Sequence, residues 1–414
     1  MKRLFAIILG VMMMLSACQT VNPGPGDSTP TGDPTMPTYA QLDYKSVATN
    51  NPDINEAGLE ASYLNQGNLA RLAKVIEKAN RGEKVVIAAL GGSITEGMSA
   101  TRPTLRYSSQ VLKWFRDTWP NGNFELANAG IGSTGSIIGG GRMQEDVLQY
   151  NPDLIIIEFA CNDGVSDLET ESYEGVIYRA LTAANNPAVM LVYFCREDGG
   201  SSQAVEIPVG LKFDLPMISY NNWYKQAKKD GLIQWSDISP DIVHPNDRGH
   251  AVAARLITHR LELVKENLDK IDKTIPPVPA TESRFVNQNL KNSLNFTPKS
   301  TGAFKPATKQ YYGFASLSSG WVAEAGNTEP FIFETESNVV TLVFKRQVMT
   351  PGAKLKVIVD GWEVMTIDSN GGAAEYADLR TILTRDNNKK VTVELRLTED
   401  SPAGSKFLLL GIVE

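Results

Sequence analysis

Between residues 68 and 268, short apolar runs alternate with longer segments whose apolar positions recur at helical spacing. The apolar runs predict buried strands over residues 85–90, 124–128, 154–159, 188–194 and 216–219. The helical spacing predicts helices over residues 68–80, 107–119, 143–150, 172–185, 222–229 and 247–268. Such uniformly apolar strands, interleaved with helices, predict a flavodoxin-like α/β domain over residues 39–272, with a parallel sheet covered by helices on both faces.

The pattern changes after the proline-rich segment 275–279, and we expect a linker over residues 273–284. Beyond it, short strands are expected at 331–334, 339–345, 355–359, 363–367, 391–397 and 407–413. They are separated by turn residues such as Asp360-Gly361. This spacing predicts an all-β sandwich over residues 285–414.

The N-terminus has the pattern of an export signal. Positive charge at Lys2 and Arg3 precedes an apolar run over residues 4–15 that is too short for a stable membrane anchor. Residues 15–18, Leu-Ser-Ala-Cys, resemble the bacterial lipoprotein box, which implies cleavage after residue 17 and lipidation of Cys18. Gln19 then favours the outer membrane of a Gram-negative host. The alternative is an ordinary signal peptide that contains Cys18 by chance. Residues 18–38 predict a flexible tether.

Composition narrows the classes of partner. The 414-residue chain has a net charge of −7 and no basic run in its mature part, which argues against nucleic acid. Beyond Cys18 only Cys161 and Cys195 remain, so no disulfide framework is expected, and both fit small buried apolar residues better than a redox pair. The scattered histidines lack metal-ligand spacing, so we expect neither metal nor cofactor. Nothing predicts the oligomeric state.

The segment Gly91-Gly92-Ser93-Ile94-Thr95 directly follows the first predicted strand of the sheet. A serine on a tight turn there lies where an α/β hydrolase needs its nucleophile, and the two glycines allow a close approach of the backbone. Asp241 precedes His244 by three residues, so both can face one site from a single loop. The other two histidines, His250 and His259, fall in a predicted helix. We therefore predict Ser93 as nucleophile, His244 as base and Asp241 as the group that orients it.

Acyl transfer also needs donors aimed at the developing oxyanion. The glycine-rich segment 128–135 follows the second strand, and Asn162 follows the third. Backbone N–H groups of Gly132 or Ser133 and the amide of Asn162 are candidates. Each segment alone resembles an ordinary turn. Their positions after successive strands make the combination informative.

These segments resemble the blocks of the SGNH (GDSL-type) hydrolase superfamily over about residues 83–268. Its first block corresponds to residues 91–95, its second to 128–133, its third to 160–163 and its fifth to 241–244. The resemblance implies the SGNH hydrolase fold, the same triad, and an oxyanion hole from the Ser93 N–H, a second-block N–H and Asn162. Ser133 stands where the family's glycine would be, which leaves Gly132 and Ser133 as alternatives.

No long apolar lid is visible, so a triglyceride lipase is disfavoured. Polar loops are expected instead at residues 97–106, 137–142 and 196–212. Arg142 and Arg196 would lie near the catalytic end, either binding substrate hydroxyls or a carboxylate or as solvated surface charges. Four aromatic residues of the second domain either stack on sugar rings or belong to its core: Trp321, Trp362, Tyr311 and Tyr312.

An exported enzyme of this kind with an appended β-domain resembles a carbohydrate acetylesterase. We therefore expect a serine esterase that removes O-acetyl groups from a polysaccharide or oligosaccharide through an acyl-enzyme. One alternative is a lipid esterase, thioesterase or envelope-glycan O-acetyltransferase of the same superfamily. Another is a surface lipoprotein that binds glycan without catalysis.

Overall fold

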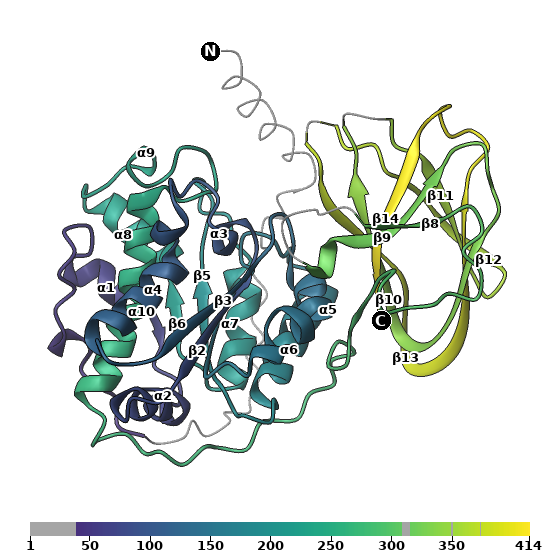
Figure 1. Cartoon of the computed structure of the whole chain (residues 1–414). Helices are drawn as coiled ribbons and strands as arrows, with labels where there is room; N and C mark the ends of the chain where they lie inside the picture. The colour runs from purple at the N-terminus through teal and green to yellow at the C-terminus, as the bar shows by residue number, and fades with distance from the viewer. Residues whose placement is uncertain (1–38, 309–314, 349–350, 373) are drawn as a thin grey trace, which may run out of the picture.

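The computed structural model describes residues 39–308, 315–348, 351–372 and 374–414. The predicted signal peptide, Cys18 and the tether lie outside these residues. Two domains lie side by side, each built on its own sheet (Figure 1). Among the described residues, no helix combines the length and the apolar character needed to cross a bilayer.

The first domain contains a six-stranded sheet in the order β1-β6-β5-β4-β2-β3. Strands β2 to β6 are parallel, and the short β1 pairs antiparallel with β6 at one edge. The strands are β1 Tyr63–Asn65, β2 Val85–Gly91, β3 Phe124–Gly130, β4 Leu154–Glu158, β5 Ala188–Tyr193 and β6 Met217–Ser219. The expected parallel α/β sheet is confirmed, with β1 and the preceding helix α1 (Glu56–Ser62) as additions.

Helices cover both faces of this sheet (Figure 1). One face carries α2 (Ala70–Asn80), α4 (Tyr107–Thr118), α8 (Tyr220–Lys229) and α10 (Asp247–Glu266). The other face carries α5 (Ser136–Asp146), α6 (Asp167–Leu181) and α7 (Gln203–Lys212). Two short helices, α3 (Ser93–Glu96) and α9 (Trp235–Ile238), lie in connecting segments.

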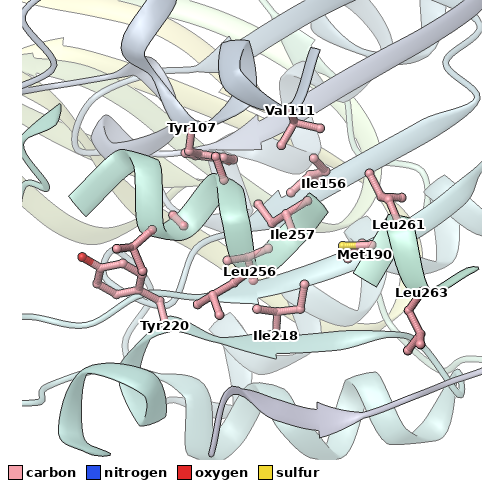
Figure 2. Close-up of a cluster of buried hydrophobic side chains, with 14 of the residues drawn as sticks. Tyr107, Val111, Ile156, Met190, Ile218, Tyr220, Leu256, Ile257, Leu261 and Leu263 are labelled. Carbon is pink, nitrogen blue, oxygen red and sulfur yellow. The ribbon is translucent and has the colours of Figure 1, made fainter. Parts of the chain in front are cut away.

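The alternation of side chains along β4 divides the core of this domain into two layers. Ile156 packs with Val111 and Ile257 on the α4/α10 side (Figure 2). Its neighbours Ile155 and Ile157 belong to the other cluster. All these side chains are almost fully buried, and each contributes about 1.5–3 kcal/mol to folding. The sheet is thereby fixed as a rigid platform for the loops at its carboxyl end.

Helix α5 corrects two predictions. The sequence predicted a polar loop over residues 137–142 and a helix only from 143, but the helix begins at Ser136 and runs through three glycines. These glycines allow close packing: a Cβ on Gly139 would lie 2.3 Å from Phe159, and one on Gly141 would lie 2.8 Å from Val413. Packing therefore overrides the low helix propensity of glycine. Likewise, the expected loop at 196–212 contains α7.

The second domain is all-β, as expected, and its named strands pair antiparallel. Its sheet has the order β12-β11-β13-β10-β14-β9-β8, with β7 paired to β14. Two predicted strands merge into one long β10, whose pairing with β13 shifts register after Ser337. The strands are β7 Leu290–Lys291, β8 Lys305–Thr308, β9 Ser319–Glu324, β10 Phe331–Arg346, β11 Lys354–Val359, β12 Trp362–Asp368, β13 Tyr376–Leu397 and β14 Lys406–Val413.

Candidate active site

Ser93 is the first residue of α3 and lies in the serine turn, residues 91–95, which connects β2 to this helix. Ser93 is only 8% exposed. Gly92 has φ of −89°, so a left-handed backbone is not the reason for glycine here. A Cβ at Gly92 would lie 2.0 Å from Oδ1 of Asn162. Glycine is therefore required because the Asn162 side chain lies directly against the serine turn, and the structure brings the first and third predicted segments together.

The structure also brings the predicted triad together. His244 Nε2 lies 2.9 Å from Ser93 Oγ, and His244 Nδ1 lies 2.8 Å from Asp241 Oδ2. The second carboxylate oxygen of Asp241 accepts the backbone N–H groups of Val243 and His244, each at 2.7 Å. Burial alone would raise the pKa of Asp241, but the hydrogen bonds from His244 and Val243 hold it below its ordinary value. This arrangement can activate a serine hydroxyl by general-base catalysis.

Two residues that sequence reasoning missed hold the loop of Asp241 and His244. Trp235 Nε1 donates to the Asp241 carbonyl at 2.5 Å. Ser239 Oγ lies 2.7 Å from the carbonyl oxygens of both Asp241 and His244. Because both contacts fix the backbone, the histidine ring keeps its orientation before substrate arrives. Neither residue carries a recognisable signal in the sequence.

The second predicted block lies beside the serine turn. Asn128 Nδ2 donates to the carbonyl of Thr95 at 2.8 Å, and its Oδ1 accepts the Gly130 N–H at 3.0 Å. Gly132 N–H donates to Oε2 of Glu96 at 2.7 Å, so this amide already has an acceptor. Ser133 is exposed, has φ of 59°, and finds no acceptor for its N–H among the described residues. Of the two alternatives, only Ser133 offers an unengaged N–H.

Glu96 is a further residue that the family motifs do not single out. It lies one helical turn after Ser93 and is half-buried. Burial raises the pKa of its carboxyl, opposed by the hydrogen bond from the Gly132 N–H and by the charges of Arg106 and Arg142. Glu96 therefore anchors the second block to the nucleophile helix.

Glu158, the last residue of β4, accepts hydrogen bonds from the serine turn. Its Oε1 accepts the N–H groups of Gly92 and Thr95, each at 3.1 Å, and the Thr95 hydroxyl at 2.6 Å. The side chain is fully buried, which raises its pKa from 4.5 to about 7. A single charged residue ending an apolar strand was a usable sequence signal, because such a group must have a buried partner.

Arg142 requires a correction. Both sequence interpretations placed its guanidinium at the surface, but the residue is 0% exposed. Its Nη1 and Nη2 donate to the carbonyl oxygens of Ala129 and Gly91, so it cannot contact substrate. Arg196 does remain partly exposed, and the N–H of the adjacent Glu197 donates to the Ile242 carbonyl. It lies beside the loop of His244, and substrate contact by Arg196 stays a prediction.

The remaining candidate residues differ in how exposed their side chains are. His250 and His259 are both buried in α10, and burial lowers the pKa of His250 to about 4. Trp321 belongs to the core of the second domain, whereas Trp362 on β12 is 79% exposed. Tyr311 and Tyr312 lie outside the described residues. Burial raises the pKa of the Cys195 thiol to about 12, which disfavours a reactive thiolate.

A nucleophilic serine, a histidine oriented by a carboxylate, and donors at the carboxyl end of a parallel sheet together define a serine hydrolase. The model of the GDSL-like lipase/acylhydrolase family matches residues 89–252. A crystal structure of a two-domain esterase active on acetylated mannans matches with 31% identity and a TM-score of 0.79. It covers 86% of this chain and 97% of its own. A crystal structure of a two-domain esterase active on acetylated mannans, co-crystallised with mannopentaose, matches with 30% identity and a TM-score of 0.78, over the same shares of the two chains.

The chain therefore belongs to the GDSL-like lipase/acylhydrolase family and is a hydrolase of carboxylic esters. A comparison with curated protein sequences finds no match.

Proposed function

We propose that this protein is a serine esterase that removes O-acetyl groups from a polysaccharide or oligosaccharide of the mannan type. The observation that carries the proposal is the likeness to the two-domain esterase active on acetylated mannans, which extends over both domains rather than the catalytic domain alone. The hydrogen-bonded Ser93, His244 and Asp241 supply the chemistry for this reaction.

In the proposed mechanism, Ser93 Oγ attacks the acetyl carbonyl carbon while His244 Nε2 takes its proton. Asp241 stabilises the imidazolium that forms, through the hydrogen bond to Nδ1. The Ser93 N–H, the Ser133 N–H and the Asn162 amide stabilise the oxyanion. The tetrahedral intermediate collapses, and His244 gives the proton to the departing sugar oxygen. Water then attacks the acetyl-Ser93 ester, again with His244 as base, and acetate leaves.

Acetate release from acetylated mannan, compared with p-nitrophenyl esters of increasing acyl length, tests the substrate class. We expect acetate from the polysaccharide and a rate on the synthetic esters that falls as the acyl chain grows. High turnover of long-chain esters with no release from any acetylated glycan would instead indicate a lipid esterase. Turnover that persists in Ser93→Ala would overturn the triad assignment.

We also propose that the protein is exported and tethered to a bacterial membrane through lipidated Cys18. The charged start, the short apolar run and the cysteine that follows it support this proposal. A tether of about twenty residues would let the enzyme reach polymeric substrate outside the cell.

A further inference from the structure

The buried Arg142 joins the ends of two strands that carry catalytic loops. Its Nη2 donates to the Gly91 carbonyl at 3.0 Å, and its Nη1 donates to the Ala129 carbonyl at 2.6 Å. Gly91 is the last residue of β2, two residues before Ser93. Ala129 lies near the end of β3, which leads into the second-block loop of residues 131–135. The Gly91 carbonyl also accepts the N–H of Ile131 at 3.1 Å. The guanidinium of Arg142 therefore fixes the serine turn relative to the second-block loop, which offers the Ser133 N–H to the oxyanion.

The charge of Arg142 is balanced by a residue that reaches the second domain. Arg142 Nη1 lies 3.0 Å from Asp146 Oδ2, and both side chains are almost fully buried. Burial lowers the pKa of Arg142, which Asp146 opposes. The same Asp146 oxygen accepts the hydroxyl of Ser316 at 2.8 Å. Ser316 lies in the short 3-10 helix η4 (Ala315–Leu317) of the C-terminal domain and is itself fully buried.

Apolar packing joins the same two regions. Ile131 of the second block and Ile138 of α5 share one buried cluster with Leu317, Leu410 and Val413 of the C-terminal domain. The C-terminal domain therefore packs directly behind the second-block loop. A polar chain of three buried residues, Ser316, Asp146 and Arg142, crosses this same contact.

We propose that Ser316, Asp146 and Arg142 form a positioning relay. Through this relay the C-terminal domain holds the serine turn and the second-block loop in their catalytic geometry. None of the three touches substrate, so all are positioning residues. The proposal rests on the serine-esterase function proposed above. It extends that function because the second domain then supports turnover of small esters as well as polysaccharides. Displacement of a reacting group by about 1 Å can cost on the order of 10²-fold in rate.

The test compares Ser316→Ala with Ser283→Ala in the full chain, using p-nitrophenyl acetate. Ser283 is a matched control because it lies in the linker segment, its side chain is also buried, and its hydroxyl also bonds to the catalytic domain. It donates to the carbonyl of Glu171 at 2.7 Å, and Glu171 lies on α6 rather than at the serine turn. We expect Ser316→Ala to lower kcat by roughly tenfold with KM unchanged, because loosened loops misplace the reacting groups. Ser283→Ala should retain the kcat of the wild type.

Thermal melts accompany each assay, and every variant is assayed well below its own melting temperature. Ser316→Cys, close in size but a weaker donor, should give an intermediate kcat and serves if the alanine variant does not fold. Equal kcat values for the Ser316 and Ser283 variants, whether both unchanged or both lowered, would overturn the relay. Ser93→Ala, assayed in parallel, separates the serine mechanism from the positioning relay. Residual turnover in this variant would contradict the serine mechanism but not the relay.

Discussion

Glu158 offers a sharp prediction because one buried carboxyl oxygen accepts three hydrogen bonds from the serine turn. Glu158→Leu would leave these donors buried without an acceptor, at about 1–3 kcal/mol each. The sum is a large part of a typical unfolding free energy of about 5–15 kcal/mol. Glu158→Gln keeps the accepting oxygen. We therefore expect the leucine variant to unfold or lose activity. The glutamine variant should keep both its fold and its activity.

The titration of the Glu158 carboxyl sets how much the free energy of unfolding changes with pH. Its pKa is raised from 4.5 to about 7 in the folded protein, so the folded state keeps a proton that the unfolded chain loses as pH rises between these values. The stabilisation is complete below pH 4.5 and is lost as pH rises through about 7, a change of about 3 kcal/mol. Glutamine has no such proton, so its stability relative to wild type should rise with pH across this interval.

Urea unfolding of wild type and Glu158→Gln at several pH values between 4.5 and 7 measures this difference. Two other buried carboxyls nearby, Asp163 and Glu206, also have pKa values raised by burial. Both remain in the variant, but the charge of Glu158 contributes to raising their pKa values, so the measured difference reports Glu158 together with its effect on these two carboxyls. A difference in unfolding free energy that stays flat with pH would refute a protonated Glu158 at the serine turn.

Three further outcomes follow from the site. Asp241→Asn should lower kcat by roughly 10³–10⁴-fold, because the amide favours the wrong histidine tautomer; steady-state kinetics within tenfold of wild type would contradict this. Gly92→Ala should lower kcat by about 10²-fold, because its Cβ would meet Asn162 at 2.0 Å, and unchanged kinetics would show that the turn yields. Cys18→Ala should move the protein from the membrane fraction to the soluble fraction, and an unchanged distribution would refute lipid anchoring.

The sequence was sufficient for the parallel sheet because buried strands are apolar on both faces and appear as continuous runs. It was insufficient for α5, where a polar loop was expected over residues 137–142. The helix depends there on close contacts of its glycines with Phe159, which directly follows β4, and with Val413 on β14, and the local sequence does not show these contacts. The short edge strand β1 escaped notice for a related reason, since its three residues carry no periodicity.

The site shows the same division between local and tertiary information. Ser93, Asp241 and His244 could be predicted because their residue types and local spacing fit one chemistry, and the structure places them within hydrogen-bond distance. Arg142 was misplaced because its burial depends on carbonyl oxygens from two other strands. The choice between Gly132 and Ser133 depended on Glu96, whose contact is visible only in three dimensions.

In the function that we propose, Ser93 is the activated nucleophile of a glycan deacetylase. A fluorophosphonate, which reacts with activated serines, tests it directly when acetate release from acetylated manno-oligosaccharides is followed in the same sample. We expect the label on Ser93 alone, a loss of acetate release in proportion to labelling, and no label in Ser93→Ala or His244→Ala. Labelling of another serine, or full deacetylation by enzyme labelled at Ser93, would contradict the account.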